Sequence, residues 1–383
     1  MGWSGRQVGL GLVMVTTGSI NTLSTKWADT MQSNNSKGDM HSFNHPFFQA
    51  DGMFIGEMLC MVAFYIATRI GMRNRNEDLA ELSIQERTDF PKWIFFLPAI
   101  CDMTSTCTMY LGLTLTYASS FQMLRGSVII FTGLFSTLFL GRKLKYYQWL
   151  GMLFVIAGLV IVGLSDFLGG NSKDNVDLKG VIIGDVLIIV AQVVTAIQMV
   201  IEEKFITKYN VPPLLVVGWE GLFGFLTLTT LLVPFYWLPV GQFSGNPRGV
   251  LEDVVDAVIQ LNNNKLLIAA MAGNILSIAF FNYAGVSVTK ELSATTRMVL
   301  DSVRTLFIWI FSLAIGWQQF QYLQPIGFVI LVVGMMLYND LVILPLIRHF
   351  ACIRRGQDQT PLYNDESRPV IIIFEQIPLL NIL

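Results

Sequence analysis

The feature that most constrains this chain is the recurrence of apolar stretches about as long as a bilayer is thick. A helix needs about 20 mostly apolar residues to cross the hydrocarbon core of a membrane. About ten stretches of the 383-residue sequence meet that length: residues 8–27, 47–69, 93–115, 119–140, 146–166, 180–201, 214–238, 266–288, 293–315 and 322–345. The pattern predicts an all-α integral membrane protein with about ten transmembrane helices.

Composition narrows the classes of function. Hydrophobic residues make up 53% of the chain and charged residues 14%, whereas a soluble domain carries about 25% charged residues. This balance excludes an ordinary globular enzyme, a disordered scaffold and a nucleic-acid binder. No nucleotide-binding, hydrolase or metalloprotease motif occurs, and the four cysteines have no metal-ligand spacing. We expect no enzymatic activity, no cofactor and no bound metal.

Orientation follows from lysine and arginine in the connections, which are enriched on the cytosolic side. With a cytosolic N-terminus, 16 of these residues fall on the cytosolic side, six on the other side and three within spans. Both termini are therefore predicted to be cytosolic. The sequon that starts at Asn34 then lies in the first lumenal connection, where it can be glycosylated.

An internal repeat appears when the sequence is shifted by 176 residues. The shift aligns Tyr146 with Tyr322, Gly151 with Gly327 and Gly158 with Gly334, among other identities. Five spans separate the two copies, so they have opposite orientations in the membrane, as in alternating-access carriers. We predict a first repeat over residues 1–166, a second over 167–345 and a cytosolic tail over 346–383.

Several segments carry a family resemblance. The stretches LTLTYASSFQ (113–122), LGRKL (140–144) and QWLG (148–151) look like the repeat of the drug/metabolite transporter superfamily. The stretches at 17–23, 119–126, 243–249 and 288–302 resemble subfamily F of solute carrier family 35 more specifically. The resemblance implies a ten-helix carrier fold built from two inverted five-helix repeats. It also implies lysosomal or mitochondrial membranes as locations, and the adenine nucleotide carrier as a partner.

Charged side chains inside spans are costly and mark functional sites. Arg297, Asp301 and Arg304 share one stripe of the ninth span, and the repeat equates Asp301 with Arg125. Arg125 is expected to form a polar stripe of the fourth span with Gln122 and Thr132. One interpretation is a cationic lining that binds phosphate or carboxylate. The other is an internal arginine–aspartate network that only holds the two spans together.

Deep carboxylates and amides complete the candidate site. Glu57 and Asp102 lie about 15 Å into their spans at 1.5 Å per residue. Removal from water disfavours the charged form of a carboxylate, so either suits proton coupling, unless it pairs with an arginine. Asn274 and Asn282 share a face of the eighth span and can orient a substrate or bridge helices. Three further acidic residues sit nearer the ends of their spans and are expected at the membrane interface: Asp51, Asp185 and Glu220.

Two further segments are informative outside the spans. Residues 239–265 include an amphipathic pattern that predicts a short helix on the lumenal surface. In the tail, Glu375 stands four residues before Leu379 and Leu380, a pattern typical of a dileucine sorting signal read by clathrin adaptors.

Together these features favour a secondary carrier of an organic, anionic solute in an endomembrane, with the lysosome preferred over the mitochondrion. The competing hypothesis is a membrane regulator that keeps the carrier fold without transport. Convergence of Arg125, Arg304, Asp102 and Asn282 on a cavity would favour the carrier, and pairing in a dry core would favour the regulator. The oligomeric state, including a homodimer, stays open.

Overall fold

The computed structural model describes residues 4–34, 39–73, 90–115, 121, 124–141, 143–169, 178–241, 248–315 and 322–338. Gln122 and the predicted sorting signal at Glu375, Leu379 and Leu380 lie outside these residues, so their roles stay predictions.

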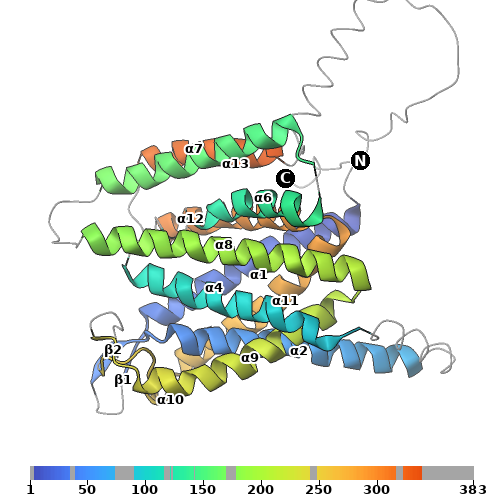
Figure 1. Cartoon of the computed structure of the whole chain (residues 1–383). Helices are drawn as coiled ribbons and strands as arrows, with labels where there is room; N and C mark the ends of the chain where they lie inside the picture. The colour runs from blue at the N-terminus through green and yellow to red at the C-terminus, as the bar shows by residue number, and fades with distance from the viewer. Residues whose placement is uncertain are drawn as a thin grey trace, which may run out of the picture.

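The described residues form a bundle of long helices that run in roughly the same direction (Figure 1). In chain order the helices are α1 (Gly5–Thr30), α2 (Pro46–Arg73), η1 (Lys92–Phe95), α4 (Phe96–Leu115), η2 (Arg125–Ser127), α6 (Val128–Leu140), α7 (Tyr146–Gly169), α8 (Leu178–Tyr209), α9 (Pro213–Trp237), α10 (Val254–Asn263), α11 (Lys265–Glu291), α12 (Ala294–Ile315) and α13 (Leu323–Tyr338). Strands β1 (Gln32–Asn34) and β2 (Met40–Ser42) pair antiparallel with Ser33 opposite His41.

Each predicted span overlaps one of the α-helices, and α8 continues to Tyr209, beyond the predicted end at residue 201. Five described stretches are long and apolar enough to cross a membrane: Pro46–Ile70, Lys92–Gly112, Gly180–Tyr209, Pro213–Trp237 and Lys265–Glu291. Shorter apolar helices occupy Arg125–Leu140, Tyr146–Ile161 and Pro325–Tyr338. The protein is an all-α, multi-pass membrane protein.

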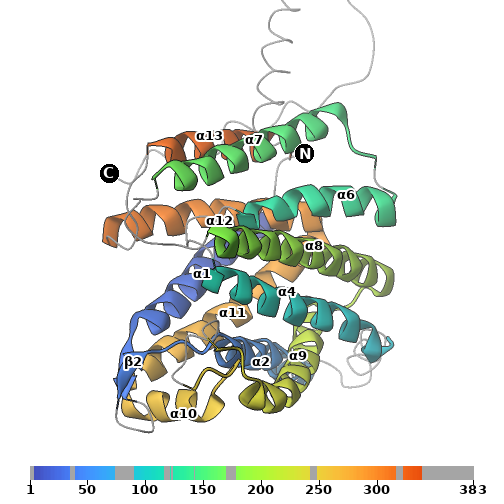
Figure 2. The same cartoon turned by 60° about the vertical axis from the view of Figure 1, so that its left-hand side comes forward.

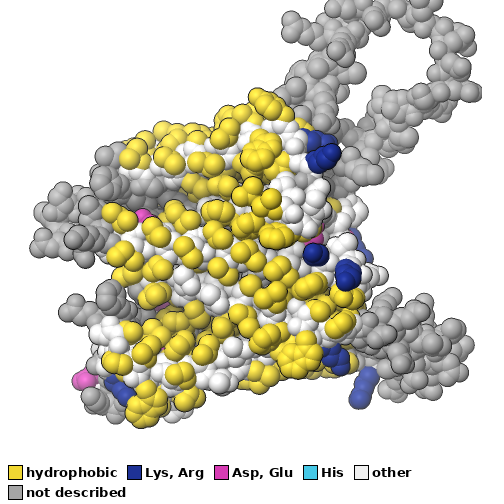
Figure 3. Space-filling model, viewed as in Figure 1, with side chains coloured by type: hydrophobic (Ala, Val, Ile, Leu, Met, Phe, Trp, Pro, Cys, Tyr) yellow, Lys and Arg dark blue, Asp and Glu magenta, His cyan; other side chains and the backbone are white. Residues whose placement is uncertain are grey.

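Hydrophobic side chains cover the flank of the bundle, whereas lysine and arginine gather at one end (Figure 3). Leu12, Leu138 and Val160 are each more than 60% exposed, which is ordinary for side chains that face lipid. Polar residues such as Glu57, Arg297 and Arg304 are instead buried. The described bundle therefore exposes apolar side chains and buries several charged ones among its apolar core residues.

The helix contacts repeat between the two predicted halves of the chain, in which α8 corresponds to α1 and α11 corresponds to α4. Helix α1 packs on α11 as α8 packs on α4, and the remaining large contacts join α2 to α9 and α7 to α13. A Cβ on Gly151 would lie 2.8 Å from the carbonyl oxygen of Gly334, and one on Gly158 would lie 2.8 Å from that of Gly327. Glycine at these positions lets α7 and α13 approach backbone to backbone, side by side in both views (Figure 2).

One end of the bundle, which we call the hairpin end, carries β1, β2 and α10 (Figure 1). Helix α10 buries Asp256 and Gln260 against the hairpin, while Val255 and Val258 are about half exposed. The short helix predicted for residues 239–265 is present, and its buried side consists of Asp256, Ala257 and Gln260.

A buried imidazole joins these elements. His45 Nδ1 lies 2.7 Å from Glu252 Oε1, and His45 Nε2 lies 3.6 Å from Asp256 Oδ2. Glu252 Oε2 also accepts hydrogen bonds from the amides of Phe47 and Phe48, at 3.0 and 3.3 Å, and so caps the start of α2. Burial lowers the pKa of His45, but the carboxylates of Asp256 and Glu252 outweigh burial and raise that pKa to about 9.

Candidate substrate cavity

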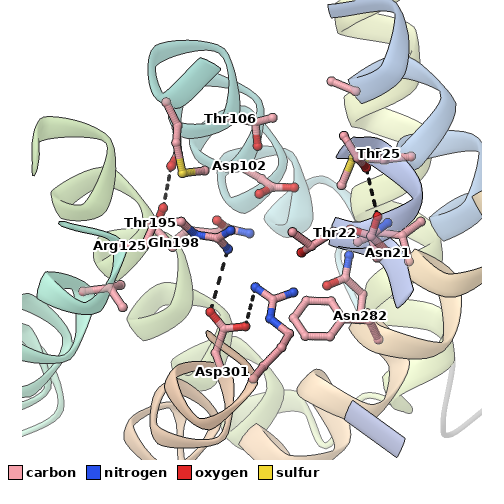
Figure 4. Close-up of a pocket in the computed structure, with 18 of the residues that line it drawn as sticks. Asn21, Thr22, Thr25, Asp102, Thr106, Arg125, Thr195, Gln198, Asn282 and Asp301 are labelled. Carbon is pink, nitrogen blue, oxygen red and sulfur yellow. Dashed lines mark hydrogen bonds and ion pairs between the residues drawn. The ribbon is translucent and has the colours of Figure 1, made fainter. Parts of the chain in front are cut away.

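A cavity of about 440 Å³ lies in the centre of the bundle. Its lining comes from α1, α2, α4, η2, α6, α8, α9, α11, α12 and α13, so both predicted repeats contribute. Figure 4 shows Arg125, Asp301, Asp102 and Asn282 around one space. Four residues that were expected to decide between a carrier and a regulator therefore line it: Asp102, Arg125, Asn282 and Arg304.

Arg304 is held inside the cavity by contacts that use most of its guanidinium group. Its Nη2 lies 2.8 Å from Asp301 Oδ1, three residues earlier on α12, and its Nη1 donates to the carbonyl oxygen of Gly18 at 3.3 Å. The guanidinium carbon sits 4.7 Å from the centre of the Phe281 ring. Nε has no hydrogen-bond partner among the described residues, although the side chain is only 3% exposed.

Arg125 approaches the same carboxylate from another element. Its Nη2 lies 3.8 Å from Asp301 Oδ2, and its guanidinium lies over the ring of Phe121. Arg125 is in the 3₁₀ turn η2, which leads directly into α6; Arg125 lines the cavity, whereas Thr132 of α6 is buried outside the lining. Two guanidinium groups thus share one carboxylate, which leaves a net charge of about +1 that suits an anion.

Arg297 takes a different partner from the one its spacing indicates. Its Nη1 donates to Glu202 Oε1 at 2.9 Å, and both side chains are almost fully buried. Asp301 pairs with Arg304 and Arg125 instead. The arginine–aspartate–arginine stripe is therefore divided between two sites.

Three more carboxylates surround this buried pair. Glu57 accepts a hydrogen bond from Asn282, and Asp102 is hydrogen-bonded to Gln198. Glu220 is 7% exposed and lines the cavity, so its expected place at the membrane interface is wrong. Electrostatic interactions link Glu57, Asp102, Glu202, Glu220 and Arg297. We call these five residues the acidic cluster; full ionisation of its side chains would leave three negative charges uncompensated.

The two candidate amides on α11 have different environments. Asn274 is buried, receives a hydrogen bond from Asn21 of α1 and is not among the residues that line the cavity. Asn282 lines the cavity and donates to Glu57 of α2. Asn274 thus bridges neighbouring helices, whereas Asn282 both bridges helices and faces the cavity.

Much of the remaining wall is formed by flexible or aromatic side chains. Five methionines and five aromatic residues line it: Met14, Met53, Met109, Met199, Met298, Phe54, Tyr110, Phe121, Phe281 and Phe328. Methionine side chains are flexible and make favourable contacts with rings. Such a wall accommodates an apolar body beside the charged groups.

The cavity extends toward the hairpin end. Lys26, Asp29 and Thr30, in the last turns of α1, line it, and Asp29 accepts a hydrogen bond from Gln49 at 2.6 Å. Asp51, hydrogen-bonded by Thr229, is not part of the lining. At the opposite end, Lys290 donates to the carbonyl oxygens of Asn210 and Val211. These contacts join the end of α11 to the connection between α8 and α9.

Comparison with known proteins shows the family of this chain. The chain is 56% identical to Solute carrier family 35 member F6 of Homo sapiens over 89% of this chain and 91% of that protein. It is 52% identical to the Rattus norvegicus protein of the same name over 97% of this chain and 99% of that protein. A family model described as CRT-like, chloroquine-resistance transporter-like, matches residues 35–271. The chain belongs to the CRT-like family.

A solved structure supports the fold of this CRT-like protein. A crystal structure of a protein with 14% sequence identity superposes with a TM-score of 0.55 and covers 88% of this chain and 96% of that chain. The predicted membership of solute carrier family 35 is confirmed, as is the class of a membrane transporter that is not an enzyme.

The sequence patterns assign neither Gln198 and Glu220 to the cavity of this CRT-like protein nor Glu202 to the acidic cluster. The predicted sixth span ends at residue 201 and does not include Glu202, whereas α8 continues to Tyr209. Gln198 lies on the same helix, α8, and its carboxamide has no charge that would mark it as a candidate in the sequence. Glu220 is seven residues after the start of α9 but faces Glu57, because Gly221 brings α9 against α2. Length and hydropathy carry no information on that approach.

Proposed function

We propose that this CRT-like protein is a secondary carrier that moves an organic anion across an endomembrane by alternating access. The observation that carries the proposal is the central cavity, which is lined by both halves of the chain and has two arginines on one shared aspartate. A buried guanidinium with a free donor needs an acceptor, and a carboxylate or phosphate oxygen meets that need.

Two inverted repeats, residues 1–166 and 167–345, would provide the alternating access. The reciprocal helix contacts support this arrangement. The 176-residue shift makes Gly151 equivalent to Gly327 and Gly158 equivalent to Gly334, and the contacts join Gly151 to Gly334 and Gly158 to Gly327. Equivalent residues that exchange partners in this way are the mark of a twofold relation.

Placement in the membrane follows from charge. We infer that the hairpin end is lumenal, because most of the lysine and arginine side chains on the face shown in Figure 3 gather at the opposite end. Asn34 is then lumenal, and it is exposed on β1 as glycosylation requires. With both termini cytosolic, the dileucine tail can reach clathrin adaptors, and we propose the lysosomal membrane as the location.

The acidic cluster, through Glu57 and Asp102, would couple transport to protons.

The competing hypothesis, a regulator that does not transport, predicts that the charged groups pair with one another in a core that contains no cavity. The described arrangement favours the carrier, because Arg125 and Arg304 share one carboxylate and both line the cavity.

Ligand-induced thermal stabilisation of the purified protein tests the anion site. A ligand at 100 times its Kd adds about 2.7 kcal/mol, so 3-phenylpropionate or phenyl phosphate should raise the unfolding temperature of the wild type. Arg304→Gln should abolish that rise. Arg6→Gln, which removes an exposed arginine paired with Glu291, is the matched control and should keep it. Equal stabilisation of Arg304→Gln and the wild type would refute the anion site.

A further inference from the structure

Buried polar atoms without partners show what the cavity still requires from a ligand. On one side, Arg304 Nε is a donor with no acceptor among the described residues. On the other, Gln198 Oε1 and Glu220 Oε1 are acceptors with no described donor. The three side chains are 3%, 5% and 7% exposed, and all line the cavity. Arg297 Nε also lacks a partner, but that guanidinium already binds Glu202.

Charge divides the cavity in the same way. The group around Asp301 is cationic, because Arg125 and Arg304 share its one carboxylate. The acidic cluster has four carboxylates for one guanidinium. Buried charge without compensation is costly, so each group favours a ligand charge of the opposite sign.

The two groups lie within reach of one small molecule. Phe281 and Asn282 are neighbours on α11. Phe281 packs against the Arg304 guanidinium, and Asn282 donates to Glu57 of the acidic cluster. One turn of one helix therefore contacts both groups.

We propose that the solute carries an anionic group and a protonated amine, and that Glu220 and Gln198 bind the amine while Arg304 and Arg125 bind the anion. An ammonium group has three donors and no acceptor, which matches two unpartnered acceptor oxygens inside an acidic cluster. The methionine and aromatic wall would hold the apolar body of the same molecule. This assignment rests on the proposed carrier function and specifies its substrate class.

Matched ligands test the amine site on the full-length protein in detergent. The first set is L-phenylalanine, 3-phenylpropionate, which lacks the amine, and 2-phenylethylamine, which lacks the acid. The second is 6-aminohexanoate, hexanoate and hexylamine, which places the two charges farther apart. Thermal stabilisation is titrated for the wild type, Glu220→Gln, Gln198→Met and Arg304→Gln. Asp51→Asn is the control, because Asp51 is a buried carboxylate hydrogen-bonded by Thr229 outside the lining.

We expect the amino acid of at least one set to bind about tenfold or more tightly than its amine-free partner, because a hydrogen bond to a charged group contributes about that much to affinity. Glu220→Gln and Gln198→Met should each reduce that preference while leaving affinity for the amine-free acid unchanged, and Asp51→Asn should leave both unchanged. The two variants remove different groups, so misfolding of one leaves the other as a test.

Other outcomes separate the amine site from the carrier hypothesis. If the amine-free acids bind as tightly as the amino acids and Arg304→Gln abolishes both, the amine site is overturned and the anion carrier stands. If neither set stabilises the wild type, the amine site and the proposed anion site are overturned together.

Discussion

The cluster around His45 predicts how stability depends on pH. His45 is fully buried and faces Glu252 from the α9–α11 connection, Asp256 from α10 and, at longer range, Asp29 from α1. His41 contacts the same Asp256 from β2. Replacing His45 with glutamine keeps a donor for Glu252 but removes the positive charge.

The magnitude follows from the pKa of His45, which rises from 6.5 to about 9 on folding. Each pH unit of such a shift corresponds to about 1.4 kcal/mol, so the charged imidazole contributes roughly 3 kcal/mol. Because the pKa in the folded state is the higher one, this contribution is fully present below pH 6.5. It is lost as the pH rises from about 6.5 to about 9.

Thermal unfolding of the purified protein, followed by tryptophan fluorescence from pH 6 to pH 9.5, measures this dependence. We expect the unfolding temperature of the wild type to fall across that range more steeply than that of His45→Gln, with the two curves closest at high pH. Asn262→Gln, at an exposed position on α10, controls for a change at this end of the molecule. Parallel curves for the wild type and His45→Gln would refute the reasoning.

Three further predictions concern packing, orientation and charge. Gly334→Ala should destabilise the protein by about 1–3 kcal/mol in thermal unfolding, because its Cβ would lie 2.7 Å from the amide nitrogen of Val155; Gly9→Ala, which meets nothing within 4 Å, should not. Asn34→Gln should remove a glycosidase-sensitive band shift in cells, and a wild type without that shift would contradict lumenal placement. Asp301→Asn should tighten binding of 3-phenylpropionate in a titration while lowering the unfolding temperature, because two guanidinium groups lose their shared carboxylate.

The positions of the helices could be predicted from the sequence because each apolar stretch is a local property. Residues 47–69 predict α2 at Pro46–Arg73, and residues 214–238 predict α9 at Pro213–Trp237. The cost of placing a charge in hydrocarbon also singled out Arg125, Asp102 and Arg304 as interior residues before their partners were known.

Partners were decided only by packing. Spacing along α12 places Arg297 and Asp301 on one stripe. Because α8 packs nearby, however, Arg297 forms an ion pair with Glu202. Asp301 pairs with Arg304 and Arg125 instead. A helical period describes which side chains share a face; it contains nothing about which neighbouring helix presents the complementary charge.

The sequence by itself determined that this chain is a bundle of membrane-spanning helices with charged residues inside it, because length, hydropathy and charge act locally and each span must satisfy the bilayer on its own. The tertiary structure alone decided that Glu220 faces Glu57 and that α10 docks through Asp256 and Gln260. Those placements depend on contacts between residues more than 150 positions apart in the chain, where close helix approach rather than local preference sets the distance.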